Sequence, residues 1–204
     1  MSKTLRYTLI GEGFAEYQFI PAYMSWAAGQ AGDLKAIRTN IQIAVSKNPS
    51  VSKVLDRAAM YCAQSFTDDR NPCDLFIAGI DLDGTDFTDD LEIHDKRLRE
   101  LKEKMGKVYR QYEDRTILYV PIQAIDCWVY YTQHQASANS LEAVGKDDTK
   151  KKVYGDKNPD RQRIEKVVRE SAAKADFSKL AKQSRSFAHF HKQVSEFLTT
   201  YNKT

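Results

Sequence analysis

Two aspartates separated by one residue, Asp81 and Asp83, follow a continuous apolar run at residues 75–80. An apolar run that ends in acids is typical of a β-strand buried on both faces. On an extended backbone, residues two apart point the same way, so both carboxylates would face one point at the carboxyl edge of a sheet. Like charges this close repel unless a cation or a shared proton relieves them. The alternative is a simple turn, because residues 84–86 are Gly, Thr and Asp, which all favour turns.

A second acidic pair lies near the start of the chain. Residues 5–10 form an apolar, β-branched run that predicts a strand, and Glu12 follows it between two glycines. The glycines would let the backbone turn sharply from strand to helix. If the strands are parallel, Glu12 reaches the same sheet edge as Asp81 and Asp83. Glu16 falls one helical turn later, where it could share this site or only complement the helix dipole.

The elements that must position these acids alternate between strand and helix along the chain. This order predicts an α/β fold with a mostly parallel central sheet of about four strands, flanked by helices. The expected strands are Leu5–Ile10, Lys35–Val45, residues 75–80 and Arg115–Ile122; the expected helices begin at Phe14, span Val51–Phe66 and Asp89–Tyr112, and begin again at Ala124.

The sequence pattern changes after residue 133. Residues 134–159 lack apolar periodicity and are rich in polar residues, so we expect a mobile polar connection there. It would separate a domain at residues 1–133, which carries the acids, from a basic helical extension at residues 160–204. Pro159 predicts the start of the first helix of that extension, because proline is common at the first position of a helix. An apolar stripe after Ser184 predicts the last helix.

Composition narrows the classes of function. The net charge is +3, but residues 146–204 carry 15 Lys or Arg against 8 Asp or Glu, or +7. A basic region beside an acidic one suits a polyanion next to a metal, although an ordinary solvated lysine surface has the same composition. No apolar run approaches the length of about 20 residues that spans a bilayer. The three cysteines are scattered and the first residues show no leader pattern, so we expect reduced thiols, a cytoplasmic location and no membrane partner.

The residues Asp81-Leu-Asp83-Gly84-Thr85 match the first motif of the haloacid dehalogenase phosphatases. In that family the first Asp is a nucleophile and the second a general acid. The resemblance covers only these residues. The family also has a later acidic pair, which should follow a strand. The later Asp147-Asp148 pair lies in the polar segment instead.

A larger part of the chain resembles the TOPRIM superfamily of topoisomerases, primases and related nucleases. The shared pattern is a strand that ends in Gly-Glu-Gly and enters a helix, then a later strand that ends in Asp-x-Asp. The spacing Glu12-Gly-x-x-Glu16 and the sequence Asp126-Cys-Trp128 are more specifically similar to small bacterial overcoming-lysogenization-defect-like TOPRIM proteins of phage-defence loci. The resemblance spans about residues 5–131, and more weakly Ser186-Phe187-x-x-Phe190.

The resemblance implies a site for Mg²⁺ or Mn²⁺ and roles for individual residues. Glu12, Asp81 and Asp83 would hold an ion, with Glu16 and Asp126 helping a second. The alternative role of Asp126 is to cap its helix. The relatives carry a later catalytic Lys, for which Lys152 is our choice among three adjacent lysines. The residues expected to bind nucleic acid are Lys150, Lys151, Lys152, Lys157, Arg161 and Arg185.

The expected function is therefore metal-dependent cleavage of phosphodiesters in DNA or RNA, as an effector of anti-phage defence. Carboxylate ligands without His or Cys suit Mg²⁺ or Mn²⁺ better than zinc. Any coupling to ATP would come from a partner ATPase subunit, and a homo-oligomer is a further partner that we consider. Two alternatives stay open: a phosphatase with Asp81 as nucleophile, and a non-catalytic subunit that binds nucleic acid or an ATPase.

Overall fold

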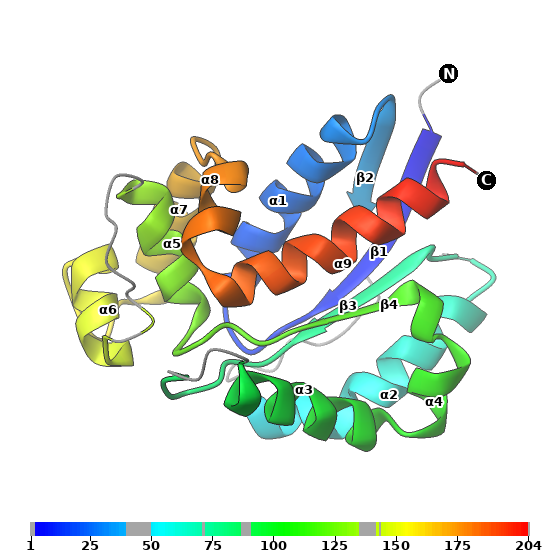
Figure 1. Ribbon diagram of the computed structural model, residues 1–204, viewed down its shortest axis with the longest axis horizontal. Helices are drawn as coiled ribbons and strands as arrows, with labels where there is room; N and C mark the ends of the chain where they lie inside the picture. The colour runs from blue at the N-terminus through cyan, green and yellow to red at the C-terminus, as the bar shows by residue number, and fades with distance from the viewer. Residues whose placement is uncertain are drawn as a thin grey trace.

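Four parallel strands form the centre of the protein, in the order β2-β1-β3-β4 (Figure 1). This computed structural model describes residues 3–39, 50–70, 72–86, 91–134, 142 and 144–203. The strands are β1 (Lys3–Ile10), β2 (Leu34–Arg38), β3 (Leu75–Gly79) and β4 (Thr116–Tyr119). The prediction of an α/β fold with a parallel four-stranded sheet is confirmed.

Helices cover both faces of the sheet, which makes three layers (Figure 1). One face carries helices from both ends of the chain, and the other carries helices from its middle. On the first face lie α1 (Glu16–Gln30), α5 (Ile125–Gln133), α7 (Arg161–Ala172), α8 (Phe177–Gln183) and α9 (Arg185–Tyr201); on the second lie α2 (Val51–Thr67), α3 (Glu92–Met105) and α4 (Lys107–Gln111), which a short 3₁₀ turn, η1 (Glu113–Arg115), joins to β4.

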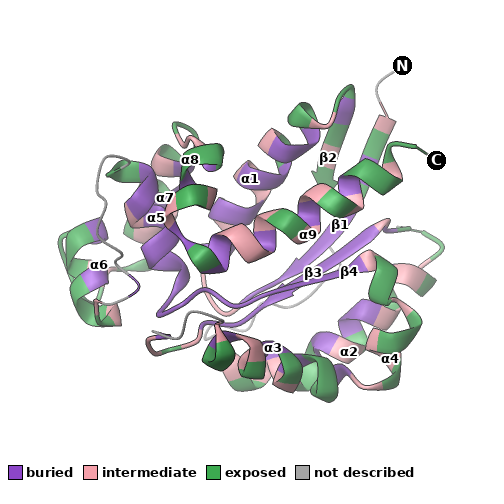
Figure 2. Ribbon diagram, in the orientation of Figure 1, coloured by how far each residue is buried: buried purple, intermediate pink, exposed green. Residues whose placement is uncertain are grey.

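The two-sided cover explains the continuous apolar run of β3. Leu75 and Ile77 pack into the core under α1 and α9, whereas Phe76 and Ala78 pack into the core under α2 and α3. All four side chains are fully buried, and Figure 2 shows the sheet buried between helices whose outer sides are exposed. A strand with both faces covered has no polar face, so its sequence shows no alternation.

Three element boundaries differ from those expected. The helix expected over residues 89–112 is interrupted at Gly106, whose φ of 56° ends α3 before α4 begins; residues 87–90 lie outside the described part. Strand β4 is shorter than the expected Arg115–Ile122. Strand β2 covers Leu34–Arg38, and the expected continuation to Val45 falls on residues 40–45, which the structure does not describe.

The expectation of an irregular connection over residues 134–159 is wrong at its centre, where α6 (Lys146–Tyr154) forms. This helix buries only Thr149, Val153 and Tyr154, so most of its surface is polar and its sequence has no apolar stripe. Gly155, in the left-handed region at φ 73°, terminates it. The rest of the expected connection includes residues 135–141 and 143, which lie outside the described residues.

The C-terminal helices share a core with the sheet. Trp128 of α5 donates its indole N–H to Ser186 Oγ at 3.0 Å, and its ring stacks on Phe190 with 5.8 Å between centroids. Phe187 meets the same indole edge-on at 5.1 Å. Two short sequence patterns that are far apart in the chain therefore form one packed cluster. None of the described helices is long and apolar enough to cross a membrane.

Tyr119, at the end of β4, lies across the neighbouring strand. A Cβ built on Gly79 of β3 would lie 2.1 Å from the Tyr119 ring. A Cβ built on Gly11, just after β1, would lie 3.0 Å from the Tyr119 hydroxyl. The ring thus lies against two strand ends that carry no side chain, and the absence of Cβ atoms is what lets it lie there.

We predict that Gly79→Ala lowers the free energy of unfolding by about 1–3 kcal/mol or more, because the methyl group overlaps a buried ring that cannot move aside. Gly29→Ala, inside α1 with no atom within 4 Å of the built Cβ, is the matched control and should stabilise by about 0.5–1 kcal/mol. Urea unfolding of both variants measures the difference. Equal stabilities would show that the Tyr119 ring is not fixed over β3.

Candidate functional site

Glu12 and Asp81 meet where β1 and β3 end, at the carboxyl edge of the sheet. Glu12 Oε1 accepts a hydrogen bond from the backbone N–H of Asp81 at 2.5 Å. Asp81 and Asp83 are joined through Lys146, whose Nζ lies 3.2 Å from Asp81 Oδ2 and 2.5 Å from Asp83 Oδ1. The structure therefore brings together the three acids that the sequence pattern placed at one edge.

Asp83 reaches this position by a route that differs from the expected one. The strand ends at Gly79, and Asp83 adopts a left-handed conformation with φ 56°, so Asp81 and Asp83 are not successive positions on one extended face. Gln123 is also left-handed, at φ 63°, and its carbonyl oxygen accepts from Asp83 N at 3.0 Å. The segments beyond β3 and β4 thus remain hydrogen-bonded, and this pairing fixes the backbone that carries both acids.

Glu16 is the first residue of α1, and its side chain is buried at 2% exposure. Its Oε2 accepts from Gly13 N at 3.1 Å. A Cβ on Gly13 would lie 3.1 Å from that same oxygen, and one on Gly11 would lie 2.9 Å from Glu16 Cβ. Neither glycine has a positive φ, so they serve close approach to Glu16 and not the sharp turn expected from the sequence.

Asp126 lies in the first turn of α5 but does not cap it. The N-cap position is Ala124, and the Asp126 carboxylate instead accepts a hydrogen bond from the Tyr154 hydroxyl of α6. Asp81 Oδ1 accepts from Ile125 N at 3.0 Å, which satisfies the start of the helix from outside. The capping alternative for Asp126 is therefore wrong, and the acid that serves the helix terminus is Asp81.

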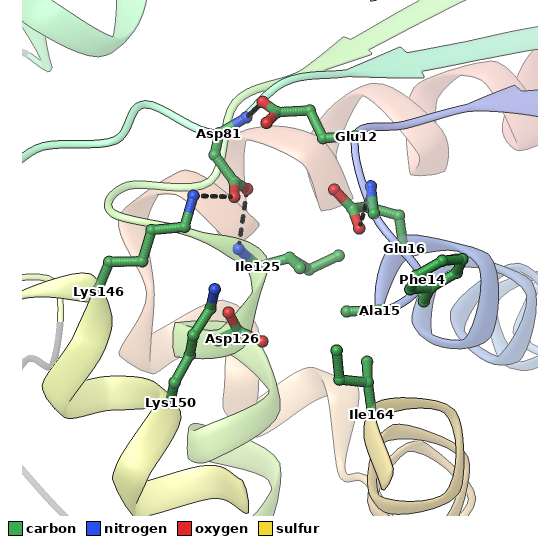
Figure 3. A pocket seen from close by; sticks show the side chains of 11 residues that line it. Glu12, Phe14, Ala15, Glu16, Asp81, Ile125, Asp126, Lys146, Lys150 and Ile164 are labelled. Carbon is green, nitrogen blue, oxygen red and sulfur yellow. Dashed lines mark hydrogen bonds and ion pairs between the residues drawn. The ribbon is translucent and has the colours of Figure 1, made fainter. Parts of the chain in front are cut away.

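Helix α6 supplies two lysines to the acids. Lys146 and Lys150, one turn apart on the same face, both line the pocket that contains Glu12, Glu16, Asp81 and Asp126 (Figure 3). The sequence interpretation missed Lys146, because the segment was not expected to be helical. The Lys-x-x-x-Lys spacing was the available signal for a shared face.

Of the other basic residues expected to act here, only Arg161 contacts a residue that lines the pocket. Lys151 is exposed with its Nζ 3.8 Å from Asp148, and Lys152 lies over the Tyr130 ring at 5.9 Å from its centroid, outside the residues that line the pocket. Lys157 is exposed. Arg161 covers the ring of Phe14, a pocket residue. Arg185 donates to the Asp86 carbonyl at 2.5 Å and lies 3.8 Å from Glu142, which ties the start of α9 to neighbouring segments.

The buried carboxyls hold their protons more tightly than usual. Burial, followed by the charges of Glu12 and Asp126, raises the pKa of Glu16 to about 7. Burial and then Glu16 and Glu12 raise the pKa of Asp81 well above its ordinary value. Burial also raises the pKa of Glu12 and of Asp126. For Lys146, burial acts to lower the pKa, but the carboxylates of Asp81 and Asp83 outweigh it and raise the pKa.

These shifts bear on whether the site suits a divalent cation. Among the described residues, no three His, Cys, Asp or Glu side chains already stand as a ligand set for a metal ion. The donors that line the pocket are nevertheless carboxylate oxygens, which Mg²⁺ and Mn²⁺ prefer. Burial and the neighbouring carboxylates raise their pKa values, and a bound cation would offset the repulsion among those carboxylates. The residues therefore fit a cation in chemistry and charge.

One polar group beneath the acids has no partner. The Tyr119 hydroxyl is buried, at 1% exposure for the residue, and makes no hydrogen bond within the described part of the chain. Burial, then the charge of Glu16, raises its pKa well above the ordinary value. A buried hydroxyl without a partner costs stability, so this side chain lowers the stability of the fold beside Glu16.

We predict that the metal-free protein loses stability as pH rises through the interval from about 4.5 to about 7. The folded-state pKa of Glu16, about 7, exceeds its ordinary value of 4.5, so the folded state binds the proton more tightly and ionisation favours unfolding. The contribution is on the order of 3 kcal/mol. Melting temperatures across this range, measured in EDTA, should fall less for Glu16→Gln than for the wild type. Parallel curves would contradict the assignment.

We also predict that Tyr119→Phe raises the free energy of unfolding by about 1 kcal/mol or more in metal-free protein, because it removes an unpaired buried hydroxyl and keeps the ring over Gly79. Tyr23→Phe is the matched control: the Tyr23 hydroxyl bonds His191 Nδ1 at 2.8 Å, so losing it should destabilise. Chemical denaturation compares the two. A loss of stability in Tyr119→Phe would mean that its hydroxyl is satisfied.

Comparison with known proteins found no match for this chain. The chain matches no family model, and neither a curated protein nor a solved structure is significantly similar to it. The fold and the site described above are therefore the grounds on which a function is proposed.

Proposed function

We propose that the protein is a divalent-metal-dependent nuclease of the TOPRIM type. The observation that carries this proposal is the meeting of Glu12 and Asp81 at the ends of two adjacent parallel strands, with Asp83 joined to them through Lys146. This is the arrangement that the resemblance implies for the acids of that superfamily. The order of the strands and the helices on both faces are compatible with it.

The positions of the acidic side chains suggest which of them would bind the metal ion. Glu12, Asp81 and Asp83 would hold Mg²⁺ or Mn²⁺. Glu12, Asp81, Glu16 and Asp126 line the pocket, whereas Asp83 lies outside its lining and contacts Lys146. The bound ion supplies Lewis acidity toward a phosphate oxygen and activates a water molecule. Glu12 stays oriented by its hydrogen bond to Asp81 N, which fixes its carboxylate toward the third strand.

The lysines would bind the phosphate. Lys146 balances Asp81 and Asp83 in the resting protein, and a cation at those acids would release its ammonium group toward a phosphate oxygen. Lys150, one turn further along α6, lines the same pocket. Ammonium groups beside a scissile phosphate stabilise the negative charge that develops during cleavage. Lys146 thereby replaces Lys152 as our candidate for the catalytic lysine.

The biological setting is proposed from the resemblance. Small relatives encoded in phage-defence loci suggest an effector of anti-phage defence that works with a partner ATPase. The net charge of +7 in residues 146–204 supports contact with a nucleic-acid backbone close to the acids. Raising the salt concentration should therefore weaken binding steeply.

We predict that Asp81→Asn and Glu12→Gln each lower Mg²⁺-dependent cleavage of plasmid DNA or RNA on the order of 100-fold or more, because each removes a charge that the ion needs. Asp56→Asn, an exposed acid on α2, is the matched control and should keep full activity. Cleavage on gels and circular dichroism, run side by side, separate loss of chemistry from loss of folding.

The same variants discriminate the alternatives. A phosphatase with Asp81 as nucleophile would lose turnover in Asp81→Asn, keep it in Glu12→Gln, and release phosphate from small phosphomonoesters. A non-catalytic subunit would bind nucleic acid or an ATPase and cleave neither class of substrate. Full activity in Glu12→Gln together with a dead Asp81→Asn would overturn the nuclease proposal.

A further inference from the structure

The pocket above the acids has two walls of different chemistry (Figure 3). It has a volume of about 330 Å³ and opens at the carboxyl edge of the sheet. Lys146 and Lys150 of α6 form one wall, and Phe14 and Ile164 line the opposite one. Glu12 and Asp81 lie at one end, between the walls. A ligand that fills this space must offer negative charge on one side and apolar area on the other.

One residue of the apolar wall, Phe14, lies outside the core, whereas the other, Ile164, packs against it. Phe14 is half-buried and is not a member of either apolar cluster of the protein. The guanidinium of Arg161 lies over its ring, with 4.6 Å from Cζ to the centroid. Ile164, on the first turn of α7, is also half-buried and lines the same wall. An aromatic ring backed by a guanidinium, outside the core and beside a basic wall, is the combination that stacks with a nucleobase.

We propose that this pocket takes one unstacked nucleotide of a single-stranded nucleic acid, with its base on Phe14 and Ile164 and its phosphate on Lys146 and Lys150. The inference deepens the proposed function and rests on it, because the phosphate would lie at the same acids. It assigns the substrate class as single strands, ends or locally opened segments.

Size and access support a single unpaired nucleotide. The pocket is near the lower end of the range for small-ligand sites, about 300–1,000 Å³, so it accommodates one nucleotide and not a stretch of helix. In a duplex the base faces are stacked inside and cannot reach a side-chain wall unless the base is extruded at a cost in free energy. A single strand pays little of that cost.

The test measures binding separately from cleavage. The probes are a 12-nucleotide single-stranded DNA, the corresponding RNA and a blunt DNA duplex of the same sequence, each with 2-aminopurine in the strand. Ca²⁺ replaces Mg²⁺ so that the acids are neutralised, and gels verify that the strands stay intact. We expect the wild type to bind at least one single strand about tenfold more tightly than the duplex, with a change in 2-aminopurine fluorescence as the base leaves its stack.

Phe14→Leu is the informative variant, because it keeps apolar bulk and removes the aromatic face. It should weaken single-strand binding about tenfold, since stacking on an aromatic ring contributes on that scale per base. Phe66→Leu is the matched control: Arg115 Cζ lies 4.3 Å from the Phe66 ring centroid, but this pair is beside the amino end of β4, away from the acids. It should bind as the wild type does. Melting temperatures verify that both variants are folded.

The outcomes are distinct for the two proposals. Single-strand binding that depends on Phe14 supports the inference, and if no cleavage accompanies it in Mg²⁺, the nuclease proposal alone fails. Equal binding by Phe14→Leu and the wild type, equal affinity for duplex and single strands, or no binding of either single strand overturns the inference. Mg²⁺-dependent cleavage that is unchanged in Phe14→Leu also overturns it, while the nuclease proposal then stands.

Discussion

The concentration of negative charge at the carboxyl edge of the sheet is the constraint around which the rest of the structure is arranged. Asp81 is buried against Glu12 and Glu16, and such neighbours raise the free energy of its ionised form. The protein offsets this with two kinds of positive charge. Backbone N–H groups at Gly13, at Ile125 and at Asp81 itself donate to the three carboxylates, and α6 places Lys146 between Asp81 and Asp83. The acids are therefore held together by hydrogen-bond donors of the backbone and by one lysine.

Much of the fold could be predicted from the sequence because its signals are local. The run Leu75–Ile80 has no polar residue, and only a strand covered on both faces requires that. The end of α3 at Gly106 and the existence of α6 have no local sequence signal as clear as this apolar run. Gly106 interrupts an apolar stripe that continues beyond it, and α6 has almost no stripe because it buries only one side.

For the site, the sequence placed the acids at one edge but not the groups that serve them. Glu12 and Asp81 follow adjacent strands, so parallel pairing brings them together, whereas the position of Asp83 also depends on its left-handed backbone and its hydrogen bond to Gln123. Lys146 and Tyr119 depend on tertiary packing, since one comes from a helix distant in sequence and the other reaches across two glycines. The spacing of apolar residues along the sequence does not reveal such contacts between distant segments. The role of Gly79 likewise becomes visible only when the Tyr119 ring is seen against it.

The two ends of the described chain are joined beside the first strand, and this has a consequence for how the protein folds. In Figure 1 the end of α9 lies beside the start of β1. Tyr201 of α9 donates its hydroxyl to Thr4 O at 3.0 Å, and its carbonyl accepts from Lys3 Nζ at 2.5 Å. Residues almost 200 positions apart must therefore meet before the core under α1 and α9 is closed, a separation that slows folding through the entropy of loop closure. During synthesis, β1 leaves the ribosome long before the helix that covers it. The core that supports the site at its carboxyl end is thus completed only after α9 has been made.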